Sequence, residues 1–136
     1  MPAPGPLIFI ATNRIRPGRL DAERARVAEL VRFVDDHEPQ LLGFHEYVND
    51  EGTEATVVQI HPDAASMARH LSLIAGRASS AYADTLDGTL AIQVYGPIDP
   101  DALAAIAGQT GDGVRITLAA EHLGGFTRGR APATPA

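Results

Sequence analysis

The sequence predicts an α+β fold whose elements follow one another in the order βαββαβ. Three observations support this: short runs of β-favouring residues, two segments with apolar residues at helical spacing, and a glycine-containing loop between two strands. The chain has 136 residues, 45% of them hydrophobic, which is enough for one compact domain. We expect this domain to span residues 7–127, between flexible tails at 1–6 and 128–136 that are rich in Pro, Ala and Gly.

A turn separates the first strand from the first helix. The run "LIFIATNRI" (7–15) favours a strand, and the Arg-Pro-Gly sequence at 16–18 is typical of a turn. A helix with one apolar face begins at Arg19 and ends before Pro39, because proline cannot donate a backbone hydrogen bond. The predicted apolar face consists of Leu20, Val27, Leu30, Val31 and Val34. The predicted polar faces carry Asp21, Glu23, Arg26, Glu29 and Arg32.

The second and third strands form a predicted hairpin within "LLGFHEYVNDEGTEATVVQIH" (41–61). Gly52 suits the left-handed position of a three-residue loop, which would pair Asn49 with Thr53. Because side chains alternate along a strand and paired residues point the same way, this register defines two faces. The face expected under the helices carries Leu42, Phe44, Val48, Val58 and Ile60. The opposite face carries His45, Tyr47, Gln59 and His61.

The segment "PDAASMARHLSLIAG" (62–76) predicts a second helix, with Asp63 in its first turn and Gly76 as its stop. Its apolar stripe is Met67, His70, Leu71 and Ile74. The run "TLAIQVYG" then predicts a fourth strand. Its helix-facing residues would be Leu90, Ile92 and Val94. A short helix with Asp99 as N-cap and Pro100 at its first position, followed by the strand-like "VRITLAA", completes the fold.

Together these elements predict a ferredoxin-like arrangement: a four-stranded antiparallel sheet, two main helices on one face, and an extra C-terminal helix and strand. The other face of the sheet has no covering layer. In the predicted register it exposes a mixed set of residues: Tyr47, Val57, Tyr95, His45, Gln59, His61 and Gln93. A homodimer that packs sheet against sheet is the simplest cover for it.

Composition limits the function classes. With 11 Lys+Arg against 17 Asp+Glu, the net charge of −6 argues against nucleic-acid binding and favours a small neutral or apolar ligand. The absence of cysteine excludes disulfides and thiolate metal sites. The apolar run at residues 7–11 is too short for a signal peptide or a membrane span, so we expect a cytoplasmic protein with no membrane association.

His70 is the most informative single residue, because helical spacing places it on an apolar stripe where its ring nitrogens need partners. It is either a hydrogen-bonded core histidine or a general base, since burial keeps an imidazole neutral and able to accept a proton. Asn13 shares its side of the first strand with apolar residues. It is either a satisfied polar group or a pocket residue that holds a substrate oxygen. Arg14 should face the other way, toward solvent or a dimer partner.

The remaining polar residues favour structural roles. His61 and His45 share a predicted face, but no further ligand completes a zinc site, so we expect hydrogen bonding at a dimer interface and no metal. His37 suits the negative end of the first helix. The "DDHE" and "NDEGTE" clusters are interpreted as solvated surfaces.

The order of elements, the "ATNRI" ending of the first strand, the hairpin "FHEYVNDEGTEATVVQIH" and a histidine in the second helix resemble the dimeric α+β barrel superfamily, and within it the antibiotic-biosynthesis-monooxygenase-like group. The resemblance covers about residues 7–95. With "VVQIHPDAASM" and "HLGGFTR" included, the pattern is most similar to small uncharacterised actinobacterial proteins of this group.

The resemblance implies a pocket between the sheet and the helices. Asn13 matches the asparagine of the "NR" pair in haem-degrading members, and His70 falls where they have tryptophan and many monooxygenase-like members have histidine. Ser80 stands where haem-degrading members place their iron-ligating histidine, and the chain has no tryptophan, so haem degradation is disfavoured. Haem binding through His70 is a remote third alternative.

The resulting hypothesis is a homodimeric, cofactor-independent monooxygenase that acts on a small phenolic or quinol-like aromatic compound in an apolar pocket. His70 would be the base and Asn13 the polar anchor. The pocket would be shaped by Phe44, Met67, Leu71 and Tyr82. The alternative is a non-catalytic dimer of the same fold, with a ligand-binding or structural role, because one base and one amide are few groups for an active site.

Overall fold

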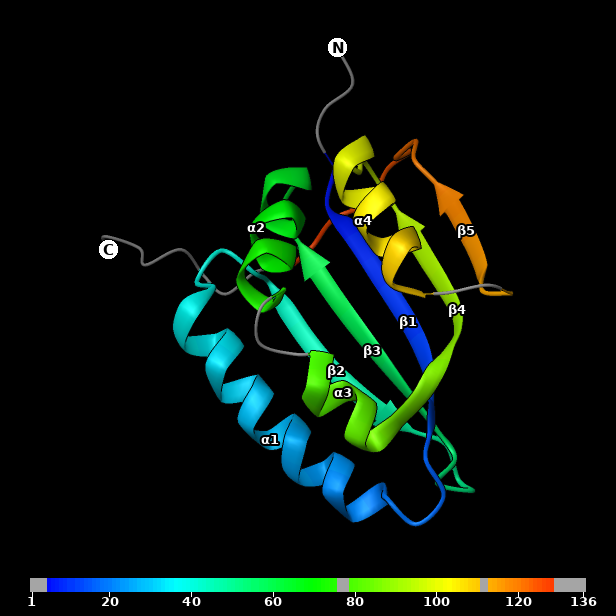
Figure 1. The fold of residues 1–136 in the computed structure, drawn as a ribbon. Coiled ribbons are helices and arrows are strands. Elements are labelled where there is room, and N and C mark those ends of the chain that lie inside the picture. The colour runs from blue at the N-terminus through cyan, green and yellow to red at the C-terminus, as the bar shows by residue number, and fades with distance from the viewer. Residues whose placement is uncertain (1–4, 76–78, 111–112, 129–136) are drawn as a thin grey trace.

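The computed structural model describes residues 5–75, 79–110 and 113–128 (Figure 1). Its elements are β1 (Leu7–Ile15), α1 (Leu20–His37), β2 (Gly43–Val48), β3 (Glu54–His61), α2 (Ala64–Ile74), α3 (Ser79–Thr85), β4 (Leu86–Tyr95), α4 (Pro100–Thr110) and β5 (Arg115–Ala119). Gly76, the expected stop of the second helix, and most of the two expected tails lie outside the described residues.

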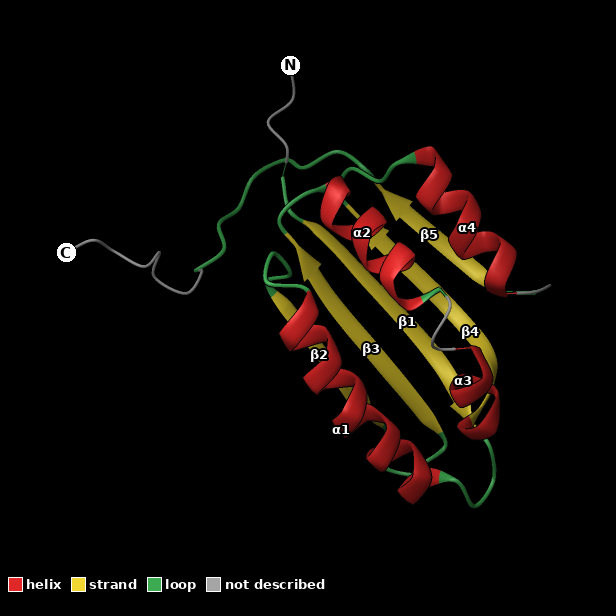
Figure 2. Ribbon diagram, turned by 60° about the vertical axis from the view of Figure 1, so that its left-hand side comes forward, coloured by secondary structure: helices red, strands yellow, loops and turns green. Residues whose placement is uncertain are grey.

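The strands form one sheet in the order β2-β3-β1-β4-β5, and the helices lie together on one of its faces (Figure 2). The predicted ferredoxin-like α+β fold is therefore confirmed. The sheet has five strands rather than four, and β5 runs parallel to β4. This parallel pairing follows from α4, since a helix between two strands carries the chain back along the sheet before the second strand begins.

The β2–β3 register differs by one residue from the predicted one. Phe44 pairs with Gln59 and His45 with Val58, so the loop spans residues 50–53. The buried side of β3 therefore carries Ala55, Val57, Gln59 and His61. Its other side carries Val58 and Ile60, which were expected under the helices. The predicted positions of Gln59 and His61 on the open face were wrong.

The Asn49 side chain explains the longer loop. Its Oδ1 accepts hydrogen bonds from the backbone N–H groups of Thr53 (2.9 Å) and Glu54 (3.0 Å). Thr53 therefore belongs to the turn, and the ladder begins with the backbone N–H of Asn49 donating to Glu54 O. Gly52 has φ of +72°, the left-handed conformation expected of it.

The faces of α1 also differ from the prediction. Val34 is buried as expected, but Val31 is exposed. Glu23 was placed on a polar face, yet it is 2% exposed and bound to Arg26. Both residues point toward the sheet because each satisfies the other's charge there.

A β-bulge interrupts the pairing of β1 with β4. Thr12 pairs with Ala91 but Asn13 with Thr89, so Leu90 is the extra residue. Ile92 and Val94 are buried as predicted. Thr89 takes the place toward the helices that was expected for Leu90, beside Asn13.

The core lies between the sheet and α2 and α4. Its buried residues are Leu7, Phe9, Ala11, Val57, Met67, Ile92, Val94 and Ile106. A smaller cluster of Ile15, Ala55 and Leu86 lies near α3. Within the described ranges, no helix combines the length and the apolar character needed to cross a membrane.

Candidate functional site

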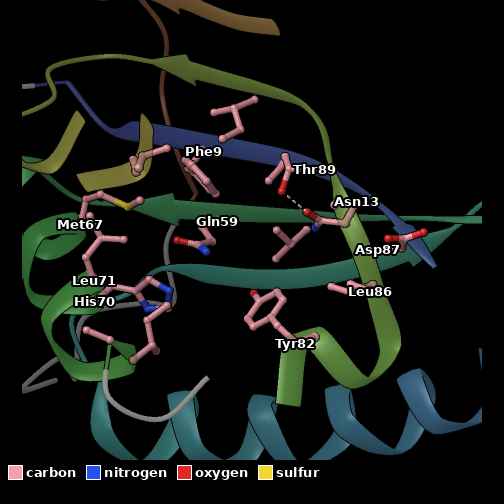
Figure 3. A pocket seen from close by; sticks show the side chains of 18 of the residues that line it. Phe9, Asn13, Gln59, Met67, His70, Leu71, Tyr82, Leu86, Asp87 and Thr89 are labelled. Atoms are coloured by element: carbon pink, nitrogen blue, oxygen red, sulfur yellow. Dashed lines mark hydrogen bonds between the residues drawn. The ribbon is translucent and has the colours of Figure 1, made fainter. Parts of the chain in front are cut away.

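A cavity of about 550 Å³ lies between the sheet and the helices α2, α3 and α4 (Figure 3). This volume falls in the usual range for small-molecule sites. The apolar part of its wall includes Phe9, Ala11, Val57, Met67, Leu71, Ile74, Leu86, Ile92 and Ile106. Its polar wall residues are Asn13, Arg16, Gln59, His70, Tyr82, Asp87 and Thr89.

His70 lies on the buried side of α2 and is 2% exposed. Its Nδ1–H donates to Oε2 of Glu38 at 2.7 Å. In a neutral imidazole the other nitrogen, Nε2, is then unprotonated and able to accept a proton. Nε2 has no hydrogen-bond partner in the described part of the chain, and the ring faces the cavity (Figure 3). The geometry is that of a base oriented by a carboxylate.

Glu38 was expected in a solvated cluster, but its side chain is fully buried. It is the C-cap of α1, and its backbone N–H donates to Val34 O at 2.8 Å. The helix ends there before Pro39, so the side chain can turn inward, beneath α2. A buried carboxylate requires a hydrogen-bonding partner, and His70 is the partner of Glu38. The sequence feature that could have identified Glu38 is its position as an acidic residue at the end of a helix, directly before proline.

His61 is fully buried on the helix side of β3, not at an interface. Its Nδ1 lies 2.7 Å from Ser66 Oγ, and its Nε2 lies 2.9 Å from Gln59 Oε1. Ser66 is positioned by the N-cap of α2, where its backbone N–H donates to Asp63 Oδ1. Burial, reinforced by His70, whose ring centroid lies 5.9 Å away, lowers the pKa of His61 to about 4. His61 is therefore neutral at physiological pH.

Gln59 is a polar wall residue that was not predicted for the pocket, as are Arg16, Asp87 and Thr89. It is 5% exposed and lies at the same end of the cavity as His70, on the wall formed by the sheet (Figure 3). Its Oε1 is engaged with His61, whereas no hydrogen bond joins its Nε2 to another described residue. We call Glu38, Gln40, Gln59, His61, Ser66 and His70 the pocket cluster.

Asn13 points toward the helices, as predicted, and lines the opposite end of the cavity (Figure 3). Its Oδ1 accepts a hydrogen bond from Thr89 Oγ1 at 2.7 Å, a contact made possible by the bulge at Leu90. Asn13 and His70 therefore do not satisfy each other. Arg14 faces the other way, as predicted, and its Nη1 donates to Asp87 O.

A second group of buried polar residues lies between α1, β2 and α3. We call Glu23, Arg26, Glu46, Tyr82 and Thr85 the closed cluster. Arg26 donates twice to Glu23, at 2.8 and 2.6 Å, and lies 3.7 Å from Glu46. Thr85 Oγ1 donates to Glu23 at 2.6 Å, and the Tyr82 ring lies 4.4 Å from the Arg26 guanidinium.

The two carboxyl groups of the closed cluster share one proton. Burial, together with a hydrogen bond to Glu23, raises the pKa of Glu46 to about 9. Burial alone would also raise the pKa of Glu23, but hydrogen bonds from Arg26, Glu46 and Thr85 lower it. Glu46 is therefore the protonated member and Glu23 the ionised one. Burial also raises the pKa of the Tyr82 phenol.

The other predicted pocket residues fall in two groups. Met67, Leu71 and Tyr82 line the cavity. Phe44 does not; it packs against the His70 ring, with ring centroids 6.0 Å apart. The side chain of Ser80 is not among those described. Across residues 5–75, 79–110 and 113–128, no three His, Asp, Glu or Cys side chains are grouped as metal ligands.

The fold is similar to those of several solved proteins. MupZ from Pseudomonas fluorescens is 21% identical, with a TM-score of 0.68 over 94% of this chain and 93% of that one. Proteins from Caulobacter crescentus and Chloroflexus aurantiacus, both named "putative antibiotic biosynthesis monooxygenase", are 18% and 17% identical, with TM-scores of 0.58 and 0.54. They cover 71% and 70% of this chain, and 92% and 95% of their own. No family model and no curated protein matches the sequence.

Proposed function

We propose that this protein, which has the fold of the antibiotic-biosynthesis-monooxygenase-like proteins, binds a small aromatic compound in its cavity and removes a proton from it with His70. The observation that carries the proposal is His70, which lines a mostly apolar cavity, is held by the buried Glu38, and has no partner for its Nε2 among the described residues. Glu38 holds the proton on Nδ1 and stabilises the imidazolium that forms when Nε2 accepts a second proton.

The reaction we propose is oxygenation without a cofactor. His70 takes a proton from a phenol, a quinol or an activated methylene, and the electron-rich anion reacts with dioxygen. For a methylene between two aromatic rings, the anion and dioxygen form a peroxide anion, which takes the proton back from His70. The resulting hydroperoxide then loses water. Overall CH₂ and O₂ give C=O and H₂O. The protein contributes desolvation in the apolar cavity and donors for the developing oxyanion.

The alternative is a ligand-binding protein without turnover. The apolar residues that form most of the cavity wall favour it, because they would hold an aromatic compound whether or not His70 accepts a proton. In that case Glu38 and His70 would orient the ligand through one hydrogen bond.

Oxygen uptake with a panel of hydroquinones and anthrones separates the two functions. His70→Gln is the informative variant, because its amide can still donate to the buried Glu38, and His37→Ala on the surface of α1 is the matched control. We expect uptake of one O₂ per anthrone, a loss of about 10²- to 10⁴-fold in His70→Gln, and full activity in the control. Unchanged uptake in folded His70→Gln contradicts the role of His70. Binding of the panel without any uptake favours the alternative.

We also propose a homodimer formed through the open face of the sheet. That face carries a continuous apolar strip across β1 and β3, where Ile8 pairs with Ile60 and Ile10 with Val58. Burial of this strip against a second copy would remove it from water. Light scattering should give twice the monomer mass, and Ile10→Lys should halve it.

A further inference from the structure

We propose that Gln59 presents its amide N–H groups, not its carbonyl oxygen, to the ligand, and that Glu38 fixes this orientation through a chain of hydrogen bonds. The inference rests on the proposed function of the cavity and names the ligand chemistry at its His70 end. A side-chain amide can be turned by 180°, so one orientation is held only where the neighbouring hydrogen-bonding groups require it.

The chain begins at the carboxylate of Glu38, which can only accept hydrogen bonds when ionised. Oε2 accepts from His70 Nδ1 at 2.7 Å. Oε1 lies 3.5 Å from Gln40 Nε2. If the Gln40 amide were reversed, its carbonyl oxygen would face this carboxylate. Two buried hydrogen-bond acceptors would then repel each other.

Gln40 passes this orientation on to Ser66 and His61. Its Nε2 donates to Ser66 Oγ at 3.3 Å, so the single hydroxyl proton of Ser66 is free to donate to His61 Nδ1 at 2.7 Å. Gln40 Oε1 is buried without a hydrogen-bond partner in the described ranges, so these donor contacts alone hold the amide.

The last step is from His61 to Gln59. His61 is neutral and its Nδ1 accepts from Ser66, so its one proton is on Nε2 and donates to Gln59 Oε1 at 2.9 Å. The amide nitrogen of Gln59 is then the atom left for the cavity, and no hydrogen bond joins it to another described residue. One carboxylate thus orients both an acceptor, His70 Nε2, and a donor, Gln59 Nε2–H.

This pairing selects a ligand chemistry. Loss of a proton to His70 leaves negative charge that is delocalised onto a neighbouring oxygen, and an N–H donor stabilises that oxygen more strongly as the charge develops. The ligand class is therefore an enolisable aromatic ketone or a phenol, whose acidic hydrogen and acceptor oxygen belong to one conjugated system. A carbonyl oxygen at Gln59 would instead repel such an anion.

The tautomer of His61 tests the orientation directly. In ¹⁵N-histidine-labelled protein at pH 7, long-range ¹H–¹⁵N spectra should show His61 protonated on Nε2 and His70 on Nδ1 (assigned with His61→Phe and His70→Gln). The exposed His45 and His122 provide reference signals. His61 protonated on Nδ1 overturns the proposal, because Gln59 would then donate to it and present its oxygen. This readout needs no turnover, so it stands even if oxygenation fails.

Ligand discrimination gives a second, independent readout. We expect the protein to bind 2-acetylnaphthalene about three- to tenfold more tightly than 2-ethylnaphthalene, the gain of one hydrogen bond. Gln59→Leu should abolish this preference, and Gln59→Glu should also remove it while keeping the shape of the side chain. Exchange of the ketone's methyl hydrogens in D₂O, followed by NMR, should fall in the same variants. A preference that persists in Gln59→Leu contradicts the proposal.

Discussion

The pocket cluster and the closed cluster are both buried, both mix charged and neutral polar groups, and both lie on the helix side of the sheet. They differ in whether their hydrogen-bonding capacity is used up. In the closed cluster Glu23 receives two bonds from Arg26 and one from Thr85. In the pocket cluster His70 and Gln59 each keep a nitrogen that no described residue bonds, and both line the cavity.

This difference shows that burial and perturbed pKa values do not by themselves identify a site. The closed cluster contains the larger shift, at Glu46, but neither of its carboxyl groups lines the cavity, which the cluster reaches through Tyr82. A group can act on a ligand only if it has an unused donor or acceptor and a path to the ligand. We therefore assign chemistry to the pocket cluster and stability to the charged residues of the closed cluster, Glu23, Arg26 and Glu46.

The largest expected contrast comes from the same substitution in each cluster. Glu38→Gln should lower kcat by about 10²- to 10⁴-fold, because a neutral amide no longer holds the proton on Nδ1 of His70 or stabilises the imidazolium. Glu46→Gln should leave kcat within about twofold. Both are measured by oxygen uptake after circular dichroism has established that the variants are folded. Equal losses of kcat in the two variants would contradict the assignment of chemistry to the pocket cluster.

Arg26→Met should have the largest effect on stability. It removes the cation that satisfies Glu23 and leaves a buried carboxylate without its charge partner, so the free energy of unfolding should fall by about 3–5 kcal/mol. Urea denaturation measures the loss. Arg24→Met, on the exposed side of α1, is the matched control and should cost less than about 0.5 kcal/mol. A small loss in Arg26→Met would mean that the closed cluster adds little to stability.

The proton on Glu46 predicts how stability depends on pH. Its folded pKa of about 9 lies above the ordinary 4.5, so its contribution is complete below pH 4.5 and is lost as pH rises toward 9. His61 acts in the opposite direction: its folded pKa of about 4 lies below 6.5, so its contribution is lost as pH falls from 6.5 to 4.

The two slopes oppose each other between pH 4.5 and 6.5, and above 6.5 only the Glu46 slope remains. There the free energy of unfolding should decrease by at most about 1.4 kcal/mol per pH unit, the limit for one proton. Glu46→Gln should flatten the decrease, which urea titrations at pH 7, 8 and 9 would reveal. An unchanged slope in the variant would show that another group takes up the proton.

The smallest contrast comes from removing one buried hydroxyl in each cluster. Thr85→Val and Ser66→Ala should each cost about 1 kcal/mol of stability. Thr85→Val removes one of the three hydrogen bonds that Glu23 accepts, and Ser66→Ala leaves Nδ1 of the buried His61 unpaired. Only Ser66→Ala should change the His61 signals, because Ser66 links Gln40 to His61. If the His61 tautomer stays fixed in Ser66→Ala, the hydrogen-bond chain does not set it.

The sequence predicts the buried side of a helix or strand best where apolar residues lie on only one of its sides. In α2, Met67, His70 and Leu71 stand on a single stripe, and the position of His70 at the cavity follows from it. In β3 both sides are apolar, Val57 on one and Val58 on the other, so alternation could not decide the register. The Asn49 side chain decides it, through bonds that leave no mark in the apolar pattern.

The failure to predict the buried charged residues has a different cause. Glu38 and Glu23 were expected in solvent because charged residues usually are, and their burial depends on partners remote in the sequence. Glu38 meets His70 across 32 positions, and Glu23 meets Thr85 across 62. Only the tertiary structure brings these residues together. A helical pattern records which side of a helix is buried, but not which charges are paired there.

The bulge in β4 places a paired amide at one end of the cavity. Without the extra residue Leu90, Thr89 would not reach Asn13, and that end of the cavity would have no paired amide. Phe9 pairs with Gln59, and Asn13 lies four residues further along β1, about 13 Å away. The cavity thus has a polar group at each end and an apolar middle. A compound that reaches both amides must match that length, so size, as well as acidity, should rank the compounds in a screen.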